Sequence, residues 1–224
     1  MRRLVCCYTL LILAMLCTVT AFAQSQSLPF YDDIQNFKKQ DSVDPPPADA
    51  ILFVGSSSFT KWTDVQEYFP NYKIINRGFG GSTLLDMIRY ADDIIMPYHA
   101  KQIVIYCGEN DLASSDTVTG EMVFQHFQEL FNIIRKKNPS TPVAFISLKP
   151  SPSRQHLWQQ MEIANDQIRH YLSKKKRASF IDVYHKMFNR DGSVMQDIFL
   201  EDNLHMNEKG YHIWQKIIEP YLIK

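Results

Sequence analysis

The strongest constraint on the fold is an apolar segment that runs directly into a glycine and three serines. The apolar part is Ile51-Leu52-Phe53-Val54, and the residues that follow it are Gly55, Ser56, Ser57 and Ser58. Such a run predicts a buried parallel strand that ends in a tight turn. A helix is expected over about 60–69, so the serines lie between the carboxyl end of a strand and the amino end of a helix. Ligands bind at that position in open α/β sheets.

The alternation of strand and helix continues along the chain. Further strands are predicted at 73–76, 102–107, 142–148 and 179–183. Further helices are predicted at about 84–95, 120–137, 154–172 and 207–218. Five strands alternating with helices imply a parallel sheet that is covered on both faces. We therefore expect one three-layer α/β/α domain over residues 48–224.

The residues before this domain show two patterns. Arg2 and Arg3 precede an apolar run over 4–21, and Ala21-Phe22-Ala23 is a small-x-small cleavage signal, so residues 1–23 are interpreted as a signal peptide. A retained membrane anchor is the alternative, because the run approaches the length of a spanning helix. Residues 24–47 are expected to form a short amphipathic helix and a proline-rich lead-in. We expect an exported protein, periplasmic or secreted, that is cleaved after Ala23 and then leaves the membrane.

The composition argues against one class of function. The chain carries 24 basic and 24 acidic residues, so it lacks the basic excess of a nucleic-acid-binding protein, and we expect no nucleic-acid partner. Its hydrophobic content of 45% suits one domain with a sizeable core. After removal of the signal peptide, Cys107 is the remaining cysteine. We expect it to be a buried, inert thiol rather than a nucleophile.

Small or polar residues follow three of the predicted strands, over 56–58, 78–81 and 108–111. Because the carboxyl ends of parallel strands meet at one edge of a sheet, these turns are expected to converge. The serines alone are also ordinary turn and helix-capping residues, so a serine nucleophile needs a base and a group that orients the base. Asp202 and His205 are the candidates, since a gap of three residues lets one short turn present both side chains.

Two alternatives to a serine, histidine and aspartate site remain. Asp202 and His205 could bind a metal, but no further ligand cluster of suitable spacing accompanies them, and we expect neither a metal nor an organic cofactor. The second alternative is an α/β-hydrolase site. It is disfavoured because the turn after Gly55 lacks the final glycine of the nucleophile elbow found in those enzymes. The other histidines are expected to be ordinary surface or core residues. His126, His156, His170 and His212 fall on predicted helices, and His99 and His185 have no motif around them.

Four segments of the chain together resemble the four sequence blocks of the SGNH, or GDSL-like, hydrolases. They are Gly55-Ser56-Ser57, Asn76 with Gly81, Gly108-Glu109-Asn110-Asp111 and Asp202-x-x-His205, and the resemblance covers about 50–221. Each block alone is a weak signal, but four blocks in the expected order are a strong one. The resemblance implies a flavodoxin-like SGNH hydrolase fold with a five-stranded parallel sheet and the activity of a carboxylic ester hydrolase.

The resemblance also implies a role for each matching residue. Ser57 is the nucleophile, His205 is the general base, and Asp202 orients that base. The oxyanion hole consists of the backbone N–H groups of Ser57 and Gly81 and the side-chain amide of Asn110. Ser56 stands where the family has an aspartate, so any role of that aspartate is lost here.

The substrate is expected to be a small-molecule or glycan ester. Export and family together suggest a small acyl group, such as acetyl, on a carbohydrate or another external ester. The alternatives are a lysophospholipase or thioesterase of the same family, and a non-catalytic carbohydrate-binding protein on the same scaffold. Trp62, Tyr98 and Arg154 lie near the predicted active edge in sequence, but we prefer packing or a surface salt bridge to substrate contact for each.

Overall fold

The computed structural model describes residues 28–224, so the predicted signal peptide over 1–23 lies outside the described residues. Residues 32–224 form one compact unit. Across residues 28–224, no helix combines the length and the apolar character that crossing a bilayer demands.

The centre of the unit is a parallel sheet of five strands in the order β2-β1-β3-β4-β5, which confirms the predicted sheet. The strands are β1 Ile51–Gly55, β2 Ile74–Gly78, β3 Gln102–Tyr106, β4 Val143–Ile146 and β5 Ala178–Ile181. Every residue of β1 and β3 is buried, because helices cover both faces of the sheet. The order 2-1-3-4-5 is that of the flavodoxin-like folds, whose ligands bind at the switch point between β1 and β3.

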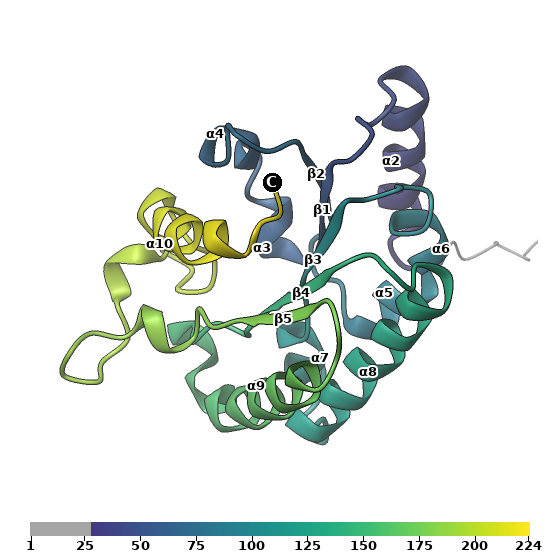
Figure 1. Cartoon of the computed structure of the whole chain (residues 1–224). Coiled ribbons are helices and arrows are strands. Elements are labelled where there is room, and N and C mark those ends of the chain that lie inside the picture. The colour runs from purple at the N-terminus through teal and green to yellow at the C-terminus, as the bar shows by residue number, and fades with distance from the viewer. Residues whose placement is uncertain (1–27) are drawn as a thin grey trace, which may run out of the picture. The chain divides into compact units, whose positions relative to one another are not determined.

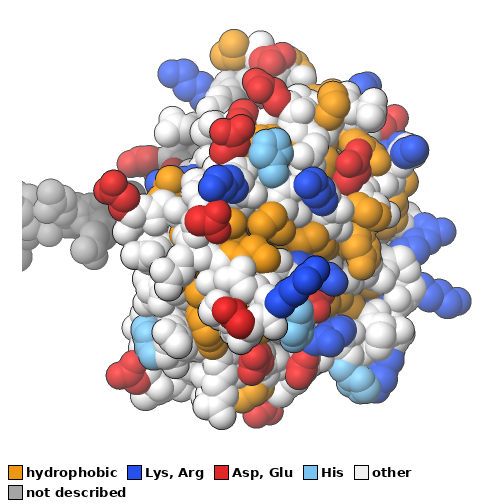
Figure 2. Space-filling model, turned by 90° about the vertical axis from the view of Figure 1, so that its left-hand side faces the viewer, with side chains coloured by type: hydrophobic (Ala, Val, Ile, Leu, Met, Phe, Trp, Pro, Cys, Tyr) orange, Lys and Arg blue, Asp and Glu red, His pale blue; other side chains and the backbone are white. Residues whose placement is uncertain are grey.

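Helices form a layer on each face of this sheet, as Figure 1 shows: α3, α4 and α10 lie on one side, and α5, α6, α8 and α9 lie on the other. The helices are α2 Tyr31–Val43, α3 Ser57–Thr60, α4 Val65–Tyr68, α5 Leu84–Arg89, α6 Ala91–Ile94, α7 Glu109–Ala113, α8 Gly120–Lys137, α9 Trp158–Ser173 and α10 Glu208–Ile218. Short 3-10 turns are η1 Pro152–Leu157, η2 His185–Met187, η3 Gln196–Ile198 and η4 Glu219–Tyr221. Figure 2 shows acidic and basic side chains interspersed over the face that carries α10.

Aromatic rings fill the layer between the sheet and α10. The buried residues Tyr211, Trp214 and Ile218 recur at helical spacing and form the apolar face of α10. The Tyr211 ring stacks on Trp62 with 4.7 Å between the centroids, and Trp214 packs edge-on against Tyr106 at 4.8 Å. Trp62 is completely buried, so its role is packing, as the sequence analysis preferred.

Two segments that were each predicted as one helix form two short helices instead. The segment over 60–69 begins earlier, as α3, and is interrupted before α4. The Asn76 side-chain amide donates hydrogen bonds to the carbonyl oxygens of Phe59 and Trp62, at 2.7 and 3.3 Å. These bonds compete with the helical bonds that the same carbonyls would accept if the helix continued. The segment over 84–95 divides at Tyr90 into α5 and α6.

The ends of the three strands nearest the predicted site lie level with one another. Gly55 at the end of β1 pairs with Gly78 of β2 on one side and with Tyr106 of β3 on the other. A Cβ atom at Gly55 would lie 2.0 Å from the carbonyl oxygen of Tyr106, so only glycine fits between these strands. The predicted convergence of the three turns is therefore confirmed, and it falls at the β1/β3 switch point.

Candidate active site

The three serines after β1 differ in their exposure to solvent. Ser56 and Ser58 are buried, whereas Ser57, the first residue of α3, is partly exposed. Within residues 28–224, the Ser57 hydroxyl makes no hydrogen bond. The ideal Cβ position at Gly80 lies 3.9 Å from the Ser57 Cβ atom, so the turn after β2 borders this serine. Of the three hydroxyls, that of Ser57 is therefore the most accessible to a substrate.

A tight turn before α10 brings Asp202 and His205 together, as the three-residue spacing predicts. The Nδ1 atom of His205 lies 2.6 Å from Oδ2 of Asp202. The other carboxylate oxygen, Oδ1, accepts the backbone N–H groups of Leu204 and His205, both at 2.9 Å. Burial acts to raise the pKa of Asp202, but the hydrogen bonds from His205 and Leu204 outweigh it and hold the pKa below its usual range. The carboxylate therefore stays ionised and fixes the orientation of the imidazole.

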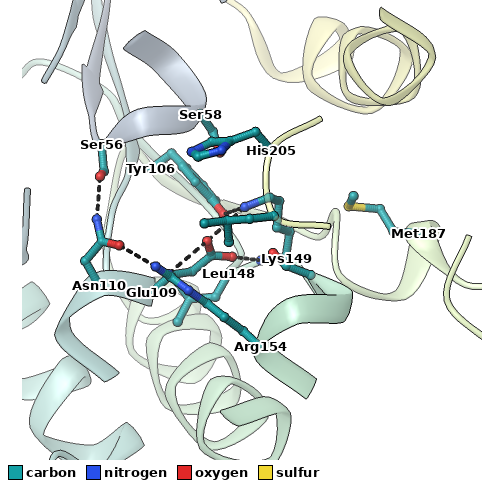
Figure 3. Close-up of polar contacts among 12 residues, drawn as sticks. Ser56, Ser58, Tyr106, Glu109, Asn110, Leu148, Lys149, Arg154, Met187 and His205 are labelled. Carbon is teal, nitrogen blue, oxygen red and sulfur yellow. Dashed lines mark hydrogen bonds and ion pairs between the residues drawn. The ribbon is translucent and has the colours of Figure 1, made fainter. Parts of the chain in front are cut away.

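The His205 ring is directed from this turn toward α3, as Figure 3 shows. The Tyr211 hydroxyl donates a 2.9 Å hydrogen bond to the carbonyl oxygen of Ser58, which joins α10 to α3. In the part of the chain that the structure describes, however, no hydrogen bond links His205 to Ser57. The structure thus places His205, the expected base, in contact with Asp202. It shows no such contact between His205 and Ser57, the expected nucleophile. Such contacts are often long in the absence of substrate.

Asn110 lies at the start of α7 and faces the turn after β1. Its Nδ2 atom donates to Oγ of Ser56 at 2.7 Å and to the carbonyl oxygen of Ser82 at 3.0 Å. The backbone N–H groups of Ser57 and Gly81 make no hydrogen bond within residues 28–224. Gly81 has a φ of 88°, which favours glycine at this place. Hydrogen-bond donors of the three residues expected in the oxyanion hole therefore lie on the turns that follow β1, β2 and β3.

Three charged residues that the sequence analysis did not place in the site surround Asn110. Arg154 donates from Nη2 to Oδ1 of Asn110 at 2.8 Å and is largely buried, so it packs within the candidate site and does not form a surface salt bridge. Glu109 and Lys149 form an ion pair of 2.8 Å, and Lys149 is only 1% exposed. Lys149 directly follows the predicted strand over 142–148. A lysine at the carboxyl end of a buried strand was the signal that could have drawn attention to it.

Two other residues named from the sequence lie away from these contacts and have structural roles. Tyr98 accepts a hydrogen bond from Nε of Arg77 at 2.6 Å and donates one to Asp41 of α2 at 2.5 Å. Its role is therefore polar packing, as expected. Cys107 is buried, as predicted, and burial raises the pKa of its thiol well above the usual value, which disfavours the nucleophilic thiolate. Among residues 28–224, no group of three or more His, Cys, Asp or Glu side chains is placed to hold a metal ion.

Several solved structures share this fold. A Streptococcus pneumonia protein provisionally described as a platelet activating factor is 19% identical, with a TM-score of 0.74 over 86% of this chain and 92% of that one. A GDSL-like lipase from Bacteroides thetaiotaomicron is 18% identical, with a TM-score of 0.72 over 84% and 96% of the two chains. A family 3 carbohydrate esterase from Clostridium thermocellum is 14% identical, with a TM-score of 0.58 over 78% and 97%. At these identities the likeness shows the fold alone.

Comparison at the level of sequence gives the family. No curated protein matches the chain. The model of the GDSL-like lipase/acylhydrolase family matches residues 49–213. This range contains the three strand ends at the switch point, Asn110, and the turn with Asp202 and His205. Because the match spans most of the sequence, the chain belongs to the GDSL-like lipase/acylhydrolase family.

Proposed function

We propose that the protein is a serine esterase that removes a small acyl group through Ser57, His205 and Asp202. The observation that carries the proposal is the hydrogen-bonded Asp202–His205 pair, whose ring is directed toward the helix that begins with the partly exposed Ser57. Membership of an acylhydrolase family supports hydrolysis of an ester. A site of this kind needs a nucleophile, a base and a group that orients the base.

The contact with Asp202 decides which nitrogen of His205 acts as the base. An ionised carboxylate can only accept hydrogen bonds, so Nδ1 of His205 carries the proton that faces Asp202. Nε2 is then the free, basic nitrogen, and it takes the proton of Ser57 as the hydroxyl attacks the ester carbonyl. The imidazolium that forms is stabilised by Asp202 and afterwards protonates the departing alcohol. Water, activated by the same nitrogen, then hydrolyses the acyl-enzyme.

The negative charge on the carbonyl oxygen is stabilised by three donors in this scheme. The backbone N–H groups of Ser57 and Gly81 have no partner within residues 28–224 and are available to it. Asn110 already donates to Ser56, so the oxyanion replaces the Ser56 hydroxyl as the acceptor of that N–H. Removing one oxyanion donor typically lowers kcat by about 10²–10³-fold.

We place the substrate among acetylated carbohydrates and similar external esters. Support comes from the fold shared with a carbohydrate esterase and from the signal-peptide pattern over residues 1–23. The alternatives, a lysophospholipase or a thioesterase, differ in the acyl chain that they accept. Preference for chain length is therefore the measurement that separates them.

The test is hydrolysis of p-nitrophenyl acetate, octanoate and palmitate by the mature protein and by Ser57→Ala, with Ser56→Ala as the matched control. Loss of the nucleophile should lower kcat by at least about 10⁴-fold, whereas Ser56→Ala retains Ser57 and should keep most of the activity. Acetate should be the best of the three esters, and release of acetate from acetylated xylan would then test the carbohydrate. Equal rates for the wild type and Ser57→Ala would refute the proposal, and a rate that rises with chain length would favour a lysophospholipase.

A further inference from the structure

Within residues 28–224, the side-chain oxygen of Asn110 has one hydrogen-bond partner and its NH₂ group has two. The oxygen Oδ1 accepts from Nη2 of Arg154 at 2.8 Å, while Nδ2 donates to Ser56 and to the carbonyl oxygen of Ser82. Figure 3 shows the amide of Asn110 between the other two side chains, joined by one dashed contact to Ser56 and by another to Arg154. A guanidinium is a donor only, so a reversed amide would place its NH₂ group against Arg154. Arg154 on the oxygen side and the carbonyl oxygen of Ser82 on the nitrogen side therefore both favour the orientation in which the NH₂ group faces the turn after β1.

Arg154 is itself held on its backbone and on its side chain. It lies within η1, where its N–H donates to the carbonyl oxygen of Ser151 at 3.0 Å. The preceding residue, Ser153, donates its N–H to the carbonyl oxygen of Asn203 at 3.0 Å, which joins η1 to the turn that carries His205. The side chain is only 15% exposed, and its Nη1 atom lies 3.6 Å from Oε2 of Glu109.

Arg154 belongs to a cluster of charged side chains next to Asn110. Lys149 and Arg154 share one carboxylate oxygen of Glu109, at 2.8 and 3.6 Å. Burial lowers the pKa of Lys149, an effect that Glu109 and Asp202 oppose and Arg154 strengthens. The guanidinium of Arg154 is thus held by the Glu109 carboxylate as well as by Oδ1 of Asn110.

We propose that Arg154 is a positioning residue that holds Asn110 in its donor orientation. The inference rests on the proposed esterase function. Glu109 precedes Asn110 in the chain and forms ion pairs with both Lys149 and Arg154. These ion pairs hold the Arg154 guanidinium next to Asn110. The Asn110 amide is proposed to stabilise the charged transition state, so loss of its orientation should appear in kcat rather than in KM.

The first test is a double-mutant cycle with p-nitrophenyl acetate. Asn110→Ala should lower kcat by about 10²–10³-fold, and Arg154→Gln by about 10–100-fold with KM nearly unchanged. If Arg154 acts through Asn110, the double variant should fall no more than about threefold below Asn110→Ala. Arg154→Lys keeps the charge without the planar fork and should recover part of the loss. Arg169→Gln, on the exposed face of α9, is the matched control and should leave kcat within about twofold.

The second test does not depend on activity. The side-chain NH₂ signals of Asn110, assigned by their loss in Asn110→Ala, should be sharp and distinct in the ¹⁵N NMR spectrum of the wild type. They should broaden in Arg154→Gln and stay unchanged in Arg169→Gln. Broadening in Arg154→Gln, together with a wild type that cleaves no ester, would uphold the positioning of Asn110 and refute the proposed function. Multiplied losses in the double variant, or unchanged signals in Arg154→Gln, would overturn the inference. If Arg154→Gln fails to fold, Arg154→Lys serves for both measurements.

Discussion

Two turns of this protein present an aspartate and a histidine three residues apart, and their internal geometry is nearly the same. In the turn that follows β5, Nδ1 of His185 lies 2.8 Å from Oδ2 of Asp182, and the His185 N–H donates to Oδ1 at 3.2 Å. In the turn before α10, the same two contacts of His205 with Asp202 measure 2.6 and 2.9 Å. The sequence analysis found no motif around His185, yet the spacing that singled out His205 is present there too.

The surroundings of the two histidines are what differ. The His185 side chain is 60% exposed, whereas that of His205 is 15% exposed. The His205 turn is enclosed by a backbone hydrogen bond from Leu200 and by the contact of Asn203 with η1. The spacing therefore creates a hydrogen-bonded pair in both turns, but only the pair of the second turn is enclosed and lies beside the proposed nucleophile and oxyanion donors.

Removing each histidine in turn should separate the two turns most strongly. His205→Ala eliminates the proposed base and should lower kcat for p-nitrophenyl acetate by at least about 10⁴-fold. His185→Ala, the matched control, removes an exposed ring and should stay within about twofold of the wild type. Comparable losses in the two variants would remove the distinction between the turns.

Replacing each aspartate should give a smaller contrast. Asp202→Asn removes the charge that stabilises the imidazolium and presents an amide that can favour the wrong tautomer of His205. A loss in kcat of about 10²–10⁴-fold is expected. Asp182→Asn should have no effect on kcat within about twofold. Full activity of Asp202→Asn would show that His205 needs no orienting group.

Each turn is also held by hydrogen bonds with one polar side chain. Removing this side chain from the turn after β5 should mainly lower stability, whereas removing it from the turn before α10 should mainly lower activity. The buried hydroxyl of Ser147 accepts the N–H groups of Val183 and Tyr184, both at 2.9 Å. Ser147→Ala leaves both unpaired and should lower the free energy of unfolding by about 2–3 kcal/mol without changing kcat in the folded protein.

Asn207 anchors the second turn. It caps α10 and donates to the carbonyl oxygens of Asp197 and Phe199, at 2.8 and 3.1 Å. Asn207→Ala should cost about 1 kcal/mol of stability but lower kcat by about tenfold, because the turn that aims His205 loosens. Urea unfolding and steady-state kinetics on both variants measure the two quantities. A larger loss of kcat in Ser147→Ala than in Asn207→Ala would reverse the assignment.

The smallest effect concerns acid stability. The folded-state pKa of Asp202 is lowered: burial opposes this, and the hydrogen bonds from His205 and Leu204 outweigh it. A lowered pKa stabilises the fold fully above the unfolded value, about 3.9, and this stabilisation is lost as the pH falls through the folded value. The difference in urea midpoint between the wild type and Asp202→Asn should therefore be constant from pH 7 to 5 and shrink toward pH 3. Because the side chain is 45% exposed, solvent keeps the difference small. An equal difference at pH 3 and pH 7 would contradict this account.

Much of the fold could be predicted from the sequence, because strands that are buried on both faces and helices that are buried on one face have recognisable patterns of apolar residues. β1 and β3 are continuous apolar runs, and α8 and α10 repeat apolar residues at helical spacing. The helix breaks before α4 and at Tyr90 were not visible in this way. The first depends on Asn76, which lies on β2 and reaches back across the fold to the carbonyl of Phe59. Periodicity describes neighbours along the chain and cannot register such a contact.

The same limit applies to the candidate site. The turn with Asp202 and His205 could be predicted because its partners are close in sequence. The bond from Arg154 to Asn110 joins residues on different turns of the sheet edge, and the position of a long side chain in an irregular segment is set by the residues packed around it. Asp182 and His185 have the same spacing as Asp202 and His205, but the His185 side chain is exposed. The spacing alone therefore does not identify the candidate site.

The stack of Trp62 on Tyr211 has a consequence for the order of events during synthesis. Chains grow from the amino end, so all five strands are made before α10. Until Tyr211 has been added, Trp62 lacks the ring that stacks on it, and Asp202 and His205 are added only a few residues earlier. The last part of the chain therefore both completes the core and supplies the proposed base with its orienting group. A chain that stops before this segment lacks a layer of its core and the proposed catalytic pair together.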